Sequence, residues 1–234
     1  MELVLEGVTK EYSGKKAVNG ISTTIKPGVV GLLGANGAGK TTLMRMICGI
    51  LKPTDGKVFF QEGEKLEASE EMYRDILGYL PQDFGYYPNF TGKDFLTYMA
   101  ALKGIERKRA KRKCQELLKM VNLEAVANKK IKTYSGGMKQ RLGIAQAVLN
   151  DPKIIILDEP TAGLDPKERV RFRNLIAELG KDSIVILSTH IVSDVESIAD
   201  RILMMQNGQF IFDGKTAEIG KDLEAFYLEE FGDE

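Results

Sequence analysis

The run Gly34-Ala35-Asn36-Gly37-Ala38-Gly39-Lys40-Thr41-Thr42 fits the pattern G-x-x-x-x-G-K-[ST] at every fixed position. The apolar residues 29–33 before it predict a short buried strand, and residues 42–50 predict a helix that stops before Pro53. A strand, a glycine-rich loop and a helix in this order are what a phosphate-binding loop requires. A glycine-rich turn with a stray lysine is the alternative, and the flanking elements argue against it.

The residue types of this loop suit phosphate groups. Glycines have no side chain to hold the backbone away from a phosphate, so successive N–H groups can turn inward, and the helix that follows adds its positive end. We expect Lys40 to reach the β- and γ-phosphates and the Thr41 hydroxyl to bind Mg²⁺.

The composition describes an ordinary globular protein. A chain of 234 residues can bury a substantial core and suggests one or two domains. Lys+Arg and Asp+Glu both number 33, so no global field draws the chain to nucleic acid or to an anionic membrane. No apolar run approaches the ~18 residues that span a bilayer, and Met1-Glu2-Leu3 lacks the basic start of a signal peptide, so we expect a cytoplasmic protein. Cys48 and Cys114 lie on apolar faces of predicted helices and are interpreted as small buried hydrophobes.

The N-terminal part predicts a small antiparallel sheet. Residues 2–12 and 17–25 are interpreted as strands, and residues 58–60 are expected to join them. Tyr12 lies where the first strand ends. An exposed ring there would stack on a nucleobase, and a buried one would pack in the turn; the spacing favours neither.

Polar side chains follow several apolar strands of the sequence. Gln82 offers a neutral amide that can hold Mg²⁺ or a water molecule. Asp158 and Glu159 follow the strand 154–157, where one carboxylate can hold Mg²⁺ and the other can orient or deprotonate an attacking water. His190 is the only histidine in the chain and also follows an apolar strand. Ligands of an open α/β sheet bind beyond the carboxyl ends of the strands, so these side chains are expected to share one site with the phosphate loop.

A helical segment interrupts the alternation of strands and helices over residues 91–150. Basic residues along 103–113 could meet lipid headgroups or nucleic acid, but no aromatic residues interleave with them, which favours a solvated helix face. Near the end of the segment, Ser135 is a natural N-cap, and Gly136 and Gly137 bare the first N–H groups of the next helix. This helix start is a second possible anion site, with a plain capped helix as the alternative.

An aromatic cluster follows Gln82 in a predicted loop. Its members are Phe84, Tyr86, Tyr87 and Phe90. Such a cluster is either local core or a docking surface, and core is favoured while no partner is in view.

Together these motifs resemble the nucleotide-binding subunits of ATP-binding cassette (ABC) transporters over essentially the whole chain. The S-G-G helix start ahead of the strand 154–157 makes the resemblance specific, because many families share the phosphate loop alone. The matches are Gly34–Thr42 with the Walker A loop, Ile154–Glu159 with the Walker B strand, Gln82 with the Q-loop, Ser135-Gly136-Gly137 with the signature core, Ala162–Asp165 with the D-loop, His190 with the switch histidine and Tyr12 with the adenine-stacking aromatic residue.

The resemblance implies an α/β fold. Its parts are a P-loop NTPase core with a mainly parallel sheet, an N-terminal antiparallel β subdomain and an inserted α-helical subdomain. In a single domain spanning residues 1–234, residues 1–83 and 152–234 would form the core with the antiparallel β subdomain. Residues 84–151 would form the helical subdomain with the signature motif.

The resemblance also implies that the chain binds and hydrolyses ATP with Mg²⁺. Glu159 would be the catalytic base, His190 would bridge the γ-phosphate and the water, and Gln82 would complete the catalytic group. Thr41, Gln82 and Asp158 would hold the metal. The implied nucleotide contacts are Tyr12, Gly34, Ala35, Asn36, Gly37, Ala38, Gly39, Lys40, Thr41, Thr42, Ser135, Gly136 and Gly137.

Two kinds of protein partner are implied. Two such subunits, a second copy or a paralogue, sandwich two ATP molecules head to tail, so Ser135 and its glycines would complete the site of the opposite chain. An integral membrane transporter subunit would place its coupling helix near Phe84–Phe90. On this resemblance, a docking surface becomes the favoured interpretation of the aromatic loop. The chain would be cytoplasmic and peripheral on the inner face of the cell membrane through that partner, with no nucleic acid expected.

Details of the motifs resemble bacterial ABC-2 type exporter ATPases, the group that includes drug, bacteriocin and sodium extruders. The resemblance rests on residues 83–88, on Tyr134-Ser135-Gly136-Gly137-Met138 and on residues 188–194. Met138 replaces the usual signature glutamine, and its effect on the interface is left open. We therefore expect export of an unknown substrate, with an importer ATPase as the alternative. A nucleic-acid or translation ATPase is disfavoured because it needs tandem cassettes or a long coiled-coil insertion.

Overall fold

The computed structural model describes residues 1–161, 164–220 and 222–232. These residues form a six-stranded sheet, a four-stranded sheet and helices around them. The predicted α/β fold, with a mainly parallel sheet, an N-terminal antiparallel sheet and inserted helices, is confirmed.

The six-stranded sheet is parallel except at one edge. Strands β9, β3, β8, β7 and β6 pair in parallel, whereas β10 pairs with β9 in an antiparallel hairpin. The hairpin turns at Asn207 and Gly208, whose φ angles of 48° and 80° suit a type I′ turn. The strand order is β10 (Gln209–Lys215), β9 (Arg201–Gln206), β3 (Gly28–Leu33), β8 (Ile184–Thr189), β7 (Ile154–Asp158) and β6 (Leu77–Leu80).

The central strands are buried on both faces, as their continuous apolar sequences predict. In β7, Ile155 and Leu157 belong to a core cluster shared with the helices, whereas Ile154 and Ile156 belong to a second cluster shared with the four-stranded sheet. Side chains of a strand alternate between its two faces, so one apolar strand supplies both cores. The six-stranded sheet thus lies between two hydrophobic cores.

The four-stranded sheet is antiparallel and lies at the N-terminal end of the chain. Its order is β2 (Lys15–Ile25), β1 (Glu2–Tyr12), β4 (Asp55–Glu62) and β5 (Glu64–Glu67). β2 begins two residues earlier than predicted, because Ser13 and Gly14, with φ of 47° and 84°, turn the chain in only two residues. Strand β5 was not predicted from the sequence.

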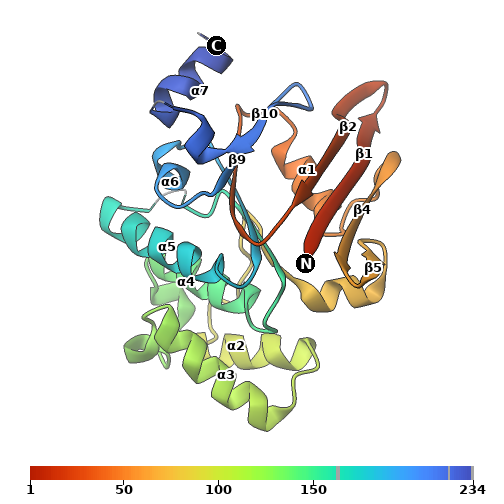
Figure 1. Cartoon of the computed structure of the whole chain (residues 1–234). Helices are drawn as coiled ribbons and strands as arrows, with labels where there is room; N and C mark the ends of the chain where they lie inside the picture. Colours follow the sequence, from red (N-terminus) through yellow and green to blue (C-terminus); the bar gives the residue numbers. More distant parts are fainter. Residues whose placement is uncertain (162–163, 221, 233–234) are drawn as a thin grey trace.

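The helices lie on both sides of the six-stranded sheet. Helix α1 (Lys40–Ile47) lies beside the antiparallel sheet, and the other helices lie on the left of Figure 1, up to its top, and at its bottom. These others are α2 (Gly92–Leu102), α3 (Arg107–Met120), α4 (Gly136–Ala147), α5 (Pro166–Leu179), α6 (Ser193–Glu196) and α7 (Leu223–Phe231). Within the described residues, no helix combines the length and the apolar character needed to cross a bilayer. Helices α2 to α4 fall in the segment predicted as a helical subdomain, and its boundaries stay a prediction.

Both cysteines are buried, as predicted. Cys48 and Cys114 are each 3% exposed and carry free thiols. Burial raises the pKa of both thiols, so both stay protonated at neutral pH.

Phe172→Ala should lower the free energy of unfolding by about 3–5 kcal/mol, the usual cost of removing a buried aromatic ring. Phe172 is 1% exposed and belongs to the core cluster between the sheet and the helices. Urea denaturation of the two proteins measures the difference. Val170→Ala on the same helix is the matched control, because Val170 is 47% exposed and should change stability by only about 0.5 kcal/mol. Equal effects of the two substitutions would contradict the packing described.

Candidate active site

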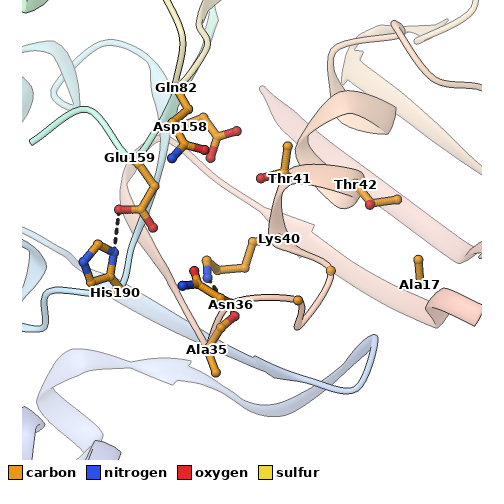
Figure 2. Close-up of a pocket in the computed structure, with 12 residues that line it drawn as sticks. Ala17, Ala35, Asn36, Lys40, Thr41, Thr42, Gln82, Asp158, Glu159 and His190 are labelled. Carbon is orange, nitrogen blue, oxygen red and sulfur yellow. Dashed lines mark hydrogen bonds and ion pairs between the residues drawn. The ribbon is translucent and has the colours of Figure 1, made fainter. Parts of the chain in front are cut away.

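A pocket of about 300 Å³ lies at the carboxyl ends of the parallel strands. Figure 2 shows the side chains that surround it. The predicted meeting of the phosphate loop with Gln82, the two acids and His190 is therefore observed as geometry. The lining residues are Ala17, Ala35, Asn36, Gly37, Gly39, Lys40, Thr41, Thr42, Gln82, Asp158, Glu159 and His190.

Two glycines allow the phosphate loop to pack tightly against neighbouring strands. A Cβ atom on Gly39 would lie 2.3 Å from the Ala17 carbonyl oxygen, and one on Gly34 would lie 2.3 Å from that of Met205. Gly39 also takes the left-handed φ of 109° as the N-cap of α1. Because its carbonyl already accepts a hydrogen bond from the Leu43 N–H at 2.9 Å, the helix begins at Lys40 rather than at residue 42 as predicted.

Lys40 is a buried cation held by the loop itself. The whole residue is only 7% exposed. Its Nζ atom donates hydrogen bonds to the carbonyl oxygens of Gly34 at 2.5 Å and Ala35 at 3.1 Å. Burial lowers the pKa of Lys40, and the nearby carboxylates of Glu159 and Asp158 oppose that shift. The ammonium group lies among loop atoms in Figure 2, where an incoming phosphate would offer it charged acceptors.

Ser188 of β8 holds Asp158, the last residue of β7, and Glu159, which follows it. Its hydroxyl donates to Asp158 Oδ1 at 2.7 Å and accepts from the Glu159 backbone N–H at 3.1 Å. Asp158 is 2% exposed, so this hydrogen bond satisfies a buried carboxylate oxygen. The sequence assigned no role to Ser188, although its position at the end of a buried strand is a signal that could have found it.

Glu159 and His190 form a hydrogen-bonded pair. Glu159 Oε2 lies 2.9 Å from His190 Nδ1, as the dashed line in Figure 2 marks. Glu159 is 7% exposed, whereas the His190 side chain is 55% exposed. Glu159 also has a φ of 46°, a left-handed backbone that is uncommon for a residue with a side chain. A carboxylate that can accept a proton therefore faces an imidazole that reaches solvent.

The pocket offers oxygen atoms of the kind that Mg²⁺ prefers. Thr41, Gln82 and Asp158 contribute a hydroxyl, an amide and a carboxylate, and the Gln82 amide lies beside Asp158 in Figure 2. In the described part of the chain, no group of three or more His, Cys, Asp or Glu side chains forms a ready metal site. These donors therefore fit Mg²⁺ that takes its remaining ligands from phosphate and water.

The start of α4 lies outside this pocket. Ser135 is its N-cap, as predicted, and accepts the Met138 N–H at 3.2 Å, while the Met138 sulfur accepts the Ser135 N–H at 3.4 Å. Gly136 lines a neighbouring cleft that shares Gln82 with the pocket. The structure therefore does not bring the S-G-G residues into the pocket of their own chain, and a role in the opposite chain stays a prediction.

Two further predicted site segments lie apart from the pocket. Tyr12 is 48% exposed, with Lys10 Nζ 5.4 Å from its ring centre, and it does not line the pocket. Its stacking on adenine stays a prediction. Of the D-loop match, residues 162–163 lie outside the described residues, and Asp165 accepts the Glu168 N–H at 2.9 Å as the N-cap of α5.

The aromatic loop is partly core and partly surface. Phe84 packs edge-on against Phe95 with ring centres 5.6 Å apart. Tyr87 lies 4.9 Å from Phe90 and 5.5 Å from Tyr98, and it is 49% exposed. Phe84, Tyr86 and Phe90 therefore pack against the core, whereas docking at the exposed part of the loop stays a prediction.

Comparison with known proteins supports the motif analysis. A sequence model described as "ABC transporter" matches residues 18–162. The ABC transporter ATP-binding protein YxlF of Bacillus subtilis (strain 168) is 40% identical over 93% of this chain and 72% of its own length. The bacitracin transport ATP-binding protein BcrA of Bacillus licheniformis is 38% identical over 87% of this chain and 66% of its own. The Nod factor export ATP-binding protein I of Rhizobium sp. (strain N33) is 36% identical over 90% of this chain and 69% of its own length. The chain thus spans from about two thirds to three quarters of these relatives.

Solved structures share the fold. The ADP conformation of MJ1267, an ATP-binding cassette of an ABC transporter, matches all of this chain with a TM-score of 0.87 and 26% identity. The dimeric structure of MJ0796, a bacterial ABC transporter cassette, covers 92% of this chain and 98% of its own, with a TM-score of 0.81 and 27% identity. A further structure of MJ0796 is a post-hydrolysis state bound to ADP and phosphate.

Lys40→Ala should abolish detectable nucleotide binding, because the β- and γ-phosphates would lose their main protein counter-charge. Titration of the purified variant with a fluorescent ATP analogue measures the affinity. Lys26→Ala is the matched control, since Lys26 is exposed and lies in the turn before β3. If the Lys40 variant bound ATP with nearly wild-type affinity, the assignment of Lys40 to phosphate binding would be wrong.

Proposed function

Since this chain belongs to the ABC transporter family and is an ATP-binding, ATP-hydrolysing subunit, we propose that it powers export of a substrate through a separate membrane protein. The main support for the proposal is that the phosphate loop, Asp158, Glu159 and His190 line one and the same pocket. Export is favoured because relatives with 38% and 36% identity are named for bacitracin transport and Nod factor export.

We assign Glu159 as the general base of hydrolysis. Its carboxylate is nearly buried and lies in a hydrogen bond 2.9 Å from His190 Nδ1, so its position is fixed before the substrate arrives. His190 would bridge the γ-phosphate and the attacking water, since its ring reaches the open side of the pocket. Gln82, which follows the neighbouring strand β6, would orient that water or the metal.

Mg²⁺ would be held by Thr41, Gln82 and Asp158. The ion would supply charge neutralisation at the phosphate oxygens. Ser188 orients Asp158 for this task through its 2.7 Å hydrogen bond, and Lys40 would bind the β- and γ-phosphates from the loop.

Dimerisation would complete the site. The S-G-G residues at the start of α4 lie outside their own pocket, and Gly136 and Gly137 are the first residues of a helix, whose N-terminus can bind an anion. A second subunit would place them on the γ-phosphate. The dimeric MJ0796 cassette, 27% identical, supports this arrangement.

The membrane partner would dock at the aromatic loop. Tyr87 and Tyr98 are 49% and 38% exposed and lie in edge-on contact, which gives a rigid aromatic patch of the kind found in protein interfaces. Docking there would keep the subunit on the inner face of the cell membrane. The segment 84–151, with α2 to α4, would act as the helical subdomain between that partner and the ATP site.

Glu159→Gln should reduce hydrolysis by about 10²–10⁴-fold, because the amide keeps the shape and loses the proton acceptor. ATP should still fill the loop, and the trapped nucleotide should then stabilise the dimer by mass action. Light scattering of the variant with ATP, with ADP and without nucleotide measures the mass. We expect a dimer with ATP alone.

Two double variants serve as controls in the Glu159→Gln background. Lys40→Ala should prevent dimer formation by removing nucleotide binding, and Ser135→Arg should prevent it while ATP still binds. A variant that binds ATP and stays monomeric would contradict the shared site. Wild-type hydrolysis by Glu159→Gln would contradict the assignment of the base.

A further inference from the structure

Two completely buried polar side chains belong to the segments that carry Glu159 and His190. Thr161 is 0% exposed and Asp194 is 1% exposed. The Thr161 hydroxyl donates to Asp194 Oδ2 at 2.6 Å. Thr161 follows Glu159 by two residues, and Asp194 follows His190 by four. This hydrogen bond therefore joins the two segments that carry the pair.

The Asp194 carboxylate has few other partners in the described structure. Its Oδ1 atom accepts no hydrogen bond there, and the nearest guanidinium, that of Arg169, lies 3.9 Å away. A buried polar group without hydrogen bonds is unfavourable, so the contact with Thr161 matters for this side chain. The hydroxyl of Thr161 is thus the one direct hydrogen-bond donor to this side chain among the described residues.

Glu159 has a backbone that needs support from both sides. Its φ of 46° is unfavourable for a residue with a side chain, and such conformations persist only where the surroundings over-determine them. On the side of β8, Ser188 accepts the Glu159 N–H. On the C-terminal side, the next anchored side chain is that of Thr161, beyond Pro160.

We propose that Thr161 and Asp194 form a positioning pair that holds Glu159 in its left-handed backbone and within hydrogen-bond distance of His190. Neither member of the pair lines the pocket, so the pair acts on hydrolysis only through Glu159 and His190. The inference rests on the proposed role of Glu159 in hydrolysis.

The test compares Thr161→Val, which keeps the shape and removes the hydroxyl, with Thr161→Ser, which restores a donor. We expect turnover at saturating ATP to fall about 10²-fold in the valine variant, since a misplacement of about 1 Å costs that much. The affinity for ATP should stay within about twofold, because the phosphate loop is untouched. The serine variant should recover most of the turnover.

A second readout follows the pair itself without hydrolysis. His190 is the only histidine of the chain, so its imidazole gives one assignable set of NMR resonances. In Thr161→Val these resonances should move toward those of Glu159→Ala, in which the ring has no carboxylate partner. In Thr161→Ser they should stay at the wild-type positions.

A double variant protects the test against loss of folding. Thr161→Val leaves a buried carboxylate without its donor, whereas Thr161→Val with Asp194→Leu removes both polar partners and is expected to fold stably. It should show the same low turnover and the same shifted resonances as Thr161→Val.

Wild-type turnover in Thr161→Val, or reduced turnover with unmoved His190 resonances, would overturn the positioning role. Equal losses in the serine and valine variants would overturn it as well. Absence of hydrolysis by the wild-type protein would instead contradict the proposed function, and the resonances would still report on the positioning pair.

Discussion

The parallel register of neighbouring strands is the constraint on which the site depends. Leu33 at the end of β3 pairs with Thr189 of β8, and Asp158 at the end of β7 pairs with Ser188. Because these strands end at the same edge of the sheet, the residues that follow them lie together at that edge, independently of the helices that connect the strands. Burial of both faces keeps this register, since a slip by one residue would exchange the two faces of every strand. The apolar sequences of the strands thus position the polar chemistry beyond them.

On the proposed function, the charges of the pocket favour a nucleotide that arrives with its metal ion. Lys40 is the cation of the pocket, and Asp158 and Glu159 are both at least nine-tenths buried beside it. Two buried carboxylates facing one ammonium leave an excess of negative charge, which is unfavourable in a partly desolvated site. Phosphates alone would increase that excess. On the proposed function, ATP therefore fits the pocket as its Mg²⁺ complex, in which the ion offsets both the phosphates and Asp158.

Local patterns predicted most of the elements and most pocket residues, because strands, caps and glycine loops depend on near neighbours in sequence. The phosphate loop, the N-cap at Ser135 and the strand before Asp158 are of this kind. Hydrogen bonds between distant segments were not predictable. Ser188 contacts residues about thirty positions away, and Thr161 meets Asp194 across 33 positions, with no spacing rule to reveal either contact. The start of α1 was also misjudged, because the left-handed Gly39 lets the helix begin inside the loop.

A buried ion pair ties the helix that begins at Ser135 to the rest of the site. Arg141 Nε of α4 lies 3.0 Å from Glu168 Oε2 of α5, and the side chains are only 10% and 16% exposed. Removing one member of a buried pair costs about 3–5 kcal/mol, so this largely buried pair is expected to help hold α4 against α5. Helix α5 also carries Arg169, 3.9 Å from Asp194. In the proposed dimer, the start of α4 that would meet the second subunit is thus connected through α5 to the surroundings of Asp194.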